Sequence, residues 1–176
     1  MMERELGRYI KKHEGFLPYP YMDTRGNWTV GWGHFLAKGG DPDNTEEQER
    51  VADVLTQFYD RVVLCGTPEE YAKALFYQDL RSAMKDVSDI LPQEVLGRPC
   101  FTYARYVALV DMMFNLGQSE FTGFKRMLSA IEAGDWSKAA DEALDSRWAE
   151  QVGDRAKRDA RLLRDGTMPE RWEDTT

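Results

Sequence analysis

HEGFLPYPYMDTRGNWTVGWGH, residues 13–34, is the stretch that decides the fold of this chain. Upstream of it, apolar residues recur at spacings of three and four, which is typical of one face of a short amphipathic helix: Met2, Leu6, Tyr9 and Ile10. Gly15 is expected to stop that helix. Downstream, Trp28, Val30 and Trp32 alternate with other residues, and alternation of period two indicates a β-strand. The stretch therefore predicts a change from helix to hairpin.

The turn of this hairpin is expected between Asp23 and Asn27, because Asp, Gly and Asn favour tight turns. Asp23 then lies at the entrance of the hairpin, close to solvent. Thr29 falls on the returning strand, and His34 falls just past it.

Two carboxylates in this stretch, those of Glu14 and Asp23, suggest acid–base chemistry. A carboxylate in the last turn of a helix faces the negative end of the helix dipole, which disfavours its ionised form and suits a proton donor. A second carboxylate across a cleft from such a donor is typical of glycoside hydrolysis. The same residue types also occur at helix ends and in turns without any catalytic role, so the residues alone leave both interpretations open.

The remainder of the chain is predicted to be mainly helical. A surface loop is expected at 36–45 and a helix at 46–63. Thr67, Pro68 and Glu70 carry the signals of a helix start, and the apolar spacing extends this helix to about residue 90. At 1.5 Å per residue it is roughly 35 Å long, too long for one small lobe, so it is expected to link two lobes.

Further helices are predicted in the C-terminal part of the chain. Residues 101–116 are apolar nearly all round, which is typical of a helix buried in a bundle, and Gly117 is expected to end it. A helix marked by Phe124, Met127, Leu128 and Ile131 ends at Gly134. Asp135 can cap a helix at 136–144, and Asp154 can cap a last, basic helix that ends near Gly166.

Composition and charge exclude several classes of protein. A chain of 176 residues can bury a core in one domain or two small lobes. No apolar run approaches a membrane span, and the start of the chain lacks the design of a signal peptide, so we expect synthesis in the cytoplasm and no membrane insertion. The net charge of −8 argues against a nucleic-acid binder. Cys65 and Cys100 are expected to be free thiols, and we expect no metal and no cofactor.

The motifs of residues 13–34 resemble those of one known family. Glu14-Gly15, Tyr21-x-Asp23-Thr24-x-Gly26 and Trp28-Thr29-Val30-Gly31-Trp32-Gly33-His34 are similar to the catalytic region of the phage-type lysozymes, the muramidase family of the T-even phage endolysins (glycoside hydrolase family 24). The resemblance continues through these C-terminal motifs: Phe114-x-x-Gly117, Gly123-Phe124, Ser146-Arg147-Trp148, Arg155-Ala156-Lys157-Arg158 and Gly166-Thr167. It covers about residues 5–167 and is weakest between Leu36 and Gly66.

The resemblance implies a role for each catalytic residue. Glu14 would be the general acid that protonates the glycosidic oxygen between N-acetylmuramic acid and N-acetylglucosamine. Asp23 would stabilise the oxocarbenium-like transition state and activate water, and Thr29 would help to hold that water. The family is regarded as inverting, which requires carboxyl groups spaced widely enough to admit water.

Other positions are assigned supporting or substrate-binding roles by the same resemblance. Phe35 and Phe114 would line the cleft that binds the sugar rings, although each also fits a core position. His34 would shape the hairpin near the site, with a direct chemical role, a metal ligand or a structural residue as alternatives. Arg155 matches the family arginine that pairs with the catalytic glutamate across the lobes; the alternative is an exposed arginine contributing under about 1 kcal/mol.

Two positions depart from the T-even pattern. Met127 stands where that pattern has a serine, and Glu142 stands where it has an asparagine. The resemblance therefore implies the chemistry of the family with altered contacts to the glycan.

The implied fold is α+β and mostly α, a two-lobed lysozyme-like domain over residues 1–176. An N-terminal hairpin lobe spans about 14–66, a linking helix about 67–91, and a C-terminal helical bundle about 92–167, with helix 2–13 packed against the bundle.

The implied activity is hydrolysis of the β-1,4 bonds of peptidoglycan by a monomer acting at the cell wall or periplasm. A phage or prophage endolysin that depends on a holin for export is the first expectation. A catalytically inactive wall-binding module and a muramidase toxin delivered by a secretion system are the alternatives. The acidity is unusual for an enzyme that acts on anionic walls.

Overall fold

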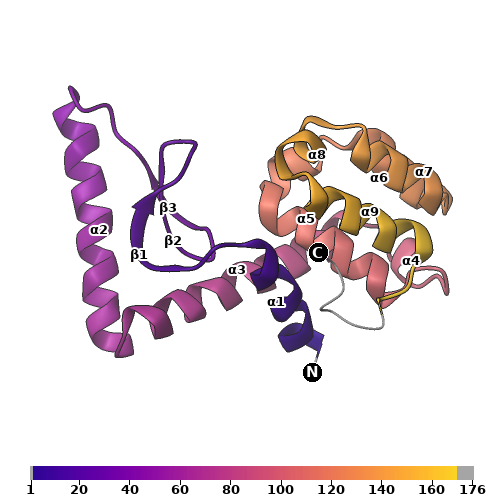
Figure 1. The fold of residues 1–176 in the computed structure, drawn as a ribbon, viewed down its shortest axis with the longest axis horizontal. Helices are drawn as coiled ribbons and strands as arrows, with labels where there is room; N and C mark the ends of the chain where they lie inside the picture. Colours follow the sequence, from indigo (N-terminus) through magenta and orange to yellow (C-terminus); the bar gives the residue numbers. More distant parts are fainter. Residues whose placement is uncertain (1, 170–176) are drawn as a thin grey trace. The chain divides into compact units, whose positions relative to one another are not determined.

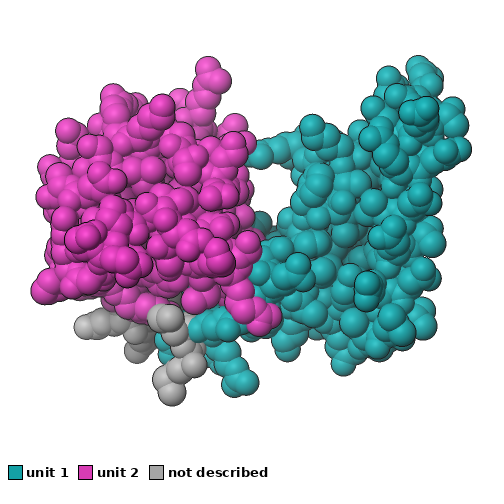
Figure 2. All heavy atoms as spheres, turned by 180° about the vertical axis from the view of Figure 1, so that it is seen from behind, with its two compact units in different colours: residues 1–79 teal, residues 80–176 magenta. Residues whose placement is uncertain are grey.

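The computed structural model describes residues 2–169, and for Met2 only the backbone. The chain divides into two compact units, Met1–Asp79 and Leu80–Thr176 (Figure 2). The ends of the domain predicted over 1–176 therefore lie outside the described residues. Most of the described chain is helical, with one small antiparallel sheet, so the predicted α+β, mostly helical class is confirmed.

The N-terminal unit begins with the predicted helix and hairpin. Helix α1 spans Met2–His13, and strands β1 (Leu17–Met22) and β2 (Asn27–Gly31) pair antiparallel around the expected turn (Figure 1). A third strand, β3 (His34–Lys38), pairs with β2 and gives the sheet order β1-β2-β3. The loop predicted from residue 36 is therefore wrong over its first three residues. Its glycines, proline and aspartates begin only at Gly39, and hydrogen bonding to β2 makes the preceding segment extended.

The register of the sheet separates its two faces. Tyr21 and Phe35 are both paired with Thr29, and Val30 is paired with His34. Because successive residues of a strand point to opposite faces, Thr29 and Val30 face opposite sides of the sheet. Val30 is fully buried on the side that packs against helices.

Two helices cover the Val30 face. Helix α2 spans Thr45–Cys65 and helix α3 spans Pro68–Ile90, close to the bounds predicted for both. Their side chains form a small core with the sheet, made of buried residues from β2, α2 and α3 and partly buried residues around them: Val30, Phe58, Ala72 and Leu75, then Phe16, Leu36, Val62 and Tyr71. The core fixes the sheet against the first half of α3.

Local capping explains where these helices begin. Asn44 accepts a hydrogen bond from the Glu47 N–H at the start of α2. Thr67 Oγ1 accepts one from the Glu70 N–H at 3.2 Å, and the Thr67 hydroxyl donates to the Glu70 carboxylate at 3.0 Å. The predicted helix start at Thr67 is therefore confirmed, since Thr67 Oγ1 caps the Glu70 N–H of the first helical turn, while the Glu70 carboxylate bonds the Thr67 hydroxyl and not a backbone N–H.

The C-terminal unit begins within α3 and continues as a bundle of helices. Its elements are α4 (Gln93–Leu96), α5 (Tyr103–Phe121), α6 (Lys125–Ala133), α7 (Trp136–Leu144), α8 (Arg147–Val152) and α9 (Asp154–Asp165). Residues of α5 form its centre, and α9 packs against both α5 and α7. The short helices α4 and α8 were not predicted. In α8, Ser146 caps the first turn by accepting a hydrogen bond from the Ala149 N–H.

Glycines interrupt or end helices of the bundle at predicted positions, and one of the two predicted aspartate caps is wrong. Gly117, at φ 73° and ψ 164°, interrupts the regular helix inside α5, and Gly134 ends α6 in the left-handed conformation. Asp135 caps α7 as predicted. Asp154 does not cap α9: it is the first residue of that helix, Gly153 holds the cap position, and the Asp154 carboxylate accepts from Lys157 instead.

The two units meet in the sequence within α3, the helix predicted to link the lobes. The packing of helix 2–13 on the C-terminal bundle involves both units and stays a prediction. Within residues 2–169, no helix is both long and apolar enough to span a bilayer.

A substitution at Gly31 tests how closely β2 packs on α3. Its φ is +66°, and a Cβ placed on it would lie 3.0 Å from Ala72 Cβ. We expect Gly31→Ala to lower the free energy of unfolding by about 3 kcal/mol, from backbone strain and overpacking together. Gly26→Ala is the control, because Gly26 has φ +78° and nothing within 4 Å of such a Cβ. It should lose only about 1 kcal/mol by urea denaturation. Equal losses would contradict the close packing.

Candidate active site

Glu14 lies at the junction between α1 and the sheet. Its N–H donates to the Ile10 carbonyl at 3.3 Å, so the backbone of Glu14 still belongs to the last turn of α1. The side chain is partly buried. Its carboxylate lies beside the β2–β3 turn, since a Cβ on Gly33 would be 3.7 Å from Glu14 Oε2. The end of the first helix thus places a carboxylate beside the β2–β3 turn.

Asp23 is held at the hairpin turn by three donors. The N–H groups of Arg25 and Asn27 each donate to Asp23 Oδ1 at 2.8 Å, and the Asn27 side-chain amide donates to Oδ2 at 3.1 Å. These bonds, led by the Asn27 N–H and joined by the charge of Arg25, lower the pKa of Asp23 below its ordinary value. The carboxylate therefore remains ionised in weakly acidic solution.

Thr29 lies in the middle of the sheet, on the face opposite Val30. It is 4% exposed, and its hydroxyl donates to the Tyr21 carbonyl at 3.4 Å. Phe35 is its neighbour on the other side and is 53% exposed. Tyr21, Thr29 and Phe35 thus form one row across three strands, with a hydroxyl between two aromatic side chains.

His34 has a specific acidic partner. Its Nδ1 lies 2.6 Å from Asp79 Oδ2, which joins the start of β3 to α3. Both side chains are partly buried. The predicted supporting role of His34 in shaping the hairpin gains a concrete contact, and the other roles considered for it stay untested.

Arg155 is buried in the C-terminal unit with Asp111. Two hydrogen bonds, from Arg155 Nε to Asp111 Oδ2 at 2.8 Å and from Arg155 Nη2 to Asp111 Oδ1 at 3.0 Å, join α9 to α5. Arg155 is 6% exposed and Asp111 0%. The alternative of an exposed helix arginine is therefore wrong, while the pairing of Arg155 with Glu14 stays a prediction. Phe114 lies on α5 and is partly buried.

A cavity of about 560 Å³ lies in the C-terminal unit, lined by residues of α5, α6, α7 and α8 and of the loops between them. It contains Met127 and Glu142, the two positions that depart from the T-even pattern. Met127 is 1% exposed and forms part of the floor with Trp148. Glu142 is paired with Arg126, whose Nε lies 2.7 Å from its carboxylate. The altered residues therefore change both the floor and the charge pattern of one cavity.

The predicted site residues fall into two sets. Glu14, Asp23, Thr29, His34 and Phe35 all belong to the N-terminal unit, on α1 and the sheet, whereas Phe114 and Arg155 belong to the C-terminal unit. Within the part of the chain that the structure describes, no group of three His, Cys, Asp or Glu side chains could hold a metal ion. Cys65 and Cys100 are exposed and unbridged.

Sequence reasoning missed the two partners Asp79 and Asp111. Asp79 lies 45 positions from His34, and no local pattern links them. Asp111 did carry a signal: it is a single acidic residue within an otherwise apolar helical segment, and a charge at such a position is almost always paired.

Comparison with known proteins gives a consistent set of relatives. The family model "Phage lysozyme" matches residues 11–162. The chain is 28% identical over 174 residues to "Probable T4-type lysozyme 2" of Dictyostelium discoideum, covering 96% of this chain and 99% of that protein. It is 29% identical over 171 residues to "Pre-baseplate central spike protein Gp5" of Enterobacteria phage T4, covering 93% of this chain but only 28% of that protein. It is 26% identical over 140 residues to "Endolysin" of Acyrthosiphon pisum secondary endosymbiont phage 1, covering 80% and 74%.

The hydrogen bonds to Asp23 predict how its carboxyl group titrates. In wild type, the midpoint followed by carbon NMR should fall below the ordinary aspartate value, because the donors favour the ionised form. Asn27→Ala removes the side-chain donor and keeps the N–H, so its midpoint should lie between that of wild type and the ordinary value. A wild-type midpoint at or above the ordinary value would contradict the arrangement.

The buried Arg155–Asp111 pair predicts a large loss of stability when one partner is removed. Asp111→Ala leaves a buried guanidinium without this carboxylate and should lower the free energy of unfolding by about 3 kcal/mol or more. Asp141→Ala is the matched control, because Asp141 pairs with Arg164 at the surface and should lose under about 1 kcal/mol. Similar losses for both variants by denaturant unfolding would show that burial of the pair does not matter.

Proposed function

The chain belongs to the phage lysozyme family, whose model matches residues 11–162, and from this premise we propose that it is an N-acetylmuramidase. The substrate is the glycan strand of peptidoglycan, cut at the β-1,4 bond between N-acetylmuramic acid and N-acetylglucosamine. The observation that carries this proposal is the arrangement of the N-terminal unit, where α1 supplies Glu14 and one hairpin supplies Asp23 and Thr29.

Glu14 is the general acid in this proposal. Its partly buried side chain at the end of α1, with the carboxylate beside the β2–β3 turn, supports that role. A protonated carboxyl beside the β2–β3 turn can give its proton to the glycosidic oxygen as the bond breaks.

Asp23 is the ionised partner. Its lowered pKa suits a carboxylate that must be charged while Glu14 is protonated. A carboxylate has about four lone-pair sites, and the three hydrogen bonds from residues 25 and 27 leave room for a water molecule to donate to it. Asp23 can therefore orient a water molecule and take its proton.

Thr29 holds the same water molecule. Its hydroxyl hydrogen is directed to the Tyr21 carbonyl, so the lone pairs of Thr29 Oγ1 can accept a hydrogen bond from water. A water that donates to both Asp23 and Thr29 presents its own lone pair to the anomeric carbon.

The proposed reaction is a single displacement at the anomeric carbon. The bond between the anomeric carbon and the glycosidic oxygen breaks, and the leaving oxygen takes the proton of Glu14. The water oxygen bonds to the anomeric carbon, and the proton it loses passes to Asp23. Attack from the face opposite the leaving group inverts the anomeric configuration.

The remaining predicted residues serve binding and support. Phe35 is more than half exposed beside Thr29, as suits a flat side chain on which a sugar ring packs. Phe114 contributes a second apolar contact to the substrate. His34 with Asp79 maintains the shape of the hairpin, and the pairing of Arg155 with Glu14 stays a prediction.

The biological setting that fits best is an endolysin of a phage or prophage. One relative with a long match carries the name "Endolysin". The enzyme would be made in the cytoplasm as a monomer, reach the wall through a holin-dependent route and degrade peptidoglycan there.

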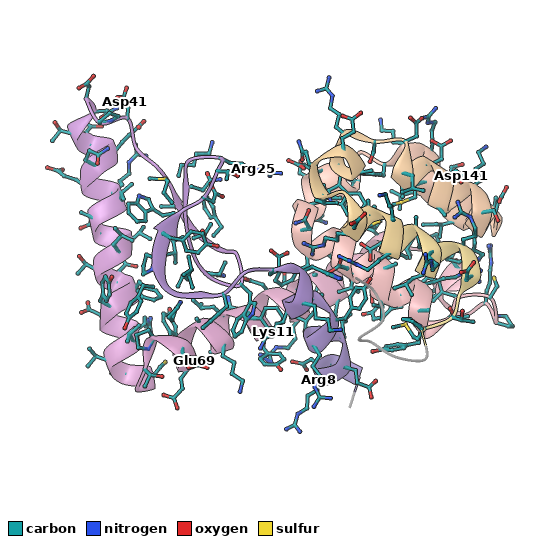
Figure 3. All side chains as sticks on the ribbon, viewed as in Figure 1. Arg8, Lys11, Arg25, Asp41, Glu69 and Asp141 are labelled. Carbon is teal, nitrogen blue, oxygen red and sulfur yellow. The ribbon has the colours of Figure 1, made fainter. Side chains whose placement is uncertain are left out.

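A comparison of wild type with Glu14→Gln tests the proposed chemistry. Permeabilised cell walls should lose turbidity with wild type and release fragments that carry new N-acetylmuramic acid reducing ends. Glu14→Gln cannot donate the proton and should lower the rate roughly a thousandfold while the circular dichroism spectrum is unchanged. Glu69→Gln, an exposed change of the same chemistry in the first turn of α3, should retain the wild-type rate (Figure 3).

Other outcomes of this experiment overturn the proposal in distinct ways. Reducing ends of N-acetylglucosamine would establish a different bond specificity. Wall binding by wild type without any cleavage would establish a binding module. A wild-type rate in Glu14→Gln would show that another group is the acid.

A further inference from the structure

Lys11 lies in a box of aromatic rings at the end of α1. Its Nζ is 3.8 Å from the centroid of the Trp32 ring, 4.5 Å from that of Phe76 and 5.0 Å from that of Tyr77. The rings come from the β2–β3 turn and from α3, and all four residues belong to the N-terminal unit. Figure 3 labels Lys11 on α1. Each distance is within the range at which a cation is attracted to the face of a ring.

The ammonium group in this box is partly withdrawn from water. Burial lowers the pKa of Lys11, and the nearby charge of Lys73 lowers it further. The faces of three rings carry the negative part of the aromatic quadrupole, and they compensate part of the lost hydration. The box therefore depends on a cation at position 11 and not only on an apolar stem.

Two residues that flank Glu14 in the sequence both contact the Trp32 ring. Lys11 precedes Glu14 by one helical turn, and Phe16, two residues after Glu14, packs against Trp32 with ring centroids 4.2 Å apart. The next residue after Trp32 is Gly33, whose Cβ position lies 3.7 Å from Glu14 Oε2. The segment 11–16 is thus attached to one ring at both ends, and the Glu14 carboxylate lies against the adjoining residue.

We propose that Lys11 is a positioning residue whose cation–π contact with Trp32 holds Glu14 in place against the β2–β3 turn. The inference rests on the proposed function of Glu14 as the acid. Without the contact, the end of α1 is free to shift relative to the turn, and a displacement of about 1 Å at a reacting group can reduce the rate on the order of a hundredfold.

Three variants separate the cation from simple packing. Lys11→Met keeps an unbranched apolar side chain and removes the charge. Lys11→Arg keeps a cation that stacks well on aromatic rings. Lys12→Met is the matched control, because it makes the same change at an exposed position of the same helix.

The kinetic readout uses solubilised, uncrosslinked glycan strands. We expect Lys11→Met to lower kcat tenfold or more with KM within twofold of wild type, since the acid is displaced while the sugar contacts remain. Lys11→Arg should restore kcat to within threefold, and Lys12→Met should match wild type. A wild-type kcat in Lys11→Met, or equal losses in the Met and Arg variants at position 11, would overturn the proposal.

A second readout does not depend on activity. The Glu14 N–H is bonded to the Ile10 carbonyl, so its hydrogen exchange reports how firmly the end of α1 is held. Its exchange should be about tenfold faster in Lys11→Met and unchanged in Lys11→Arg and Lys12→Met. Unchanged exchange in Lys11→Met would refute positioning even if wild type proved not to be a muramidase. If wild type proved inactive as a muramidase but the Glu14 N–H still exchanged faster in Lys11→Met, the positioning role would stand and only the proposed function would be refuted.

Discussion

The alternation of side chains along β2 is the constraint on which the N-terminal unit depends. One strand of five residues must present Thr29 to one face and Val30 to the other. Val30 completes the core with Phe58 and Ala72, so the position of Thr29 is set by packing on the opposite side of the sheet. A shift of one residue in register would place the hydroxyl among the apolar side chains of the core and move Val30 to the face of Thr29, so the core and the candidate site depend on the same register.

The two carboxylates of the hairpin region are positioned by different local features. Asp23 is partly exposed and receives three hydrogen bonds that favour its charge. Glu14 is partly buried at the end of α1, beside the β2–β3 turn. The turn that supplies donors and the end of the helix are both local features, and each follows from a few adjacent residues. This is why one short stretch of sequence contains both carboxylates of the proposed pair.

Local signals in the sequence predicted much of the fold, whereas contacts between residues far apart in the sequence were not predicted. Thr67 and Asp135 are caps whose bonds reach only three residues ahead, and Gly134 ends its helix through its own backbone conformation. The third strand escaped because Leu36 becomes extended through hydrogen bonding to β2 and packing on α2. The pairing of His34 with Asp79 and of Arg155 with Asp111 escaped because each joins elements more than forty positions apart. A single sequence carries no record of such distances.

Buried charge is handled differently in the two units, and the difference bears on function. In the C-terminal unit, Arg155 is matched by a carboxylate in a bidentate pair, which satisfies both groups and fixes the orientation of α9 on α5. In the N-terminal unit, Lys11 lies against ring faces, which attract a cation without supplying a competing carboxylate. The rings therefore hold the lysine without placing a second carboxylate beside Glu14.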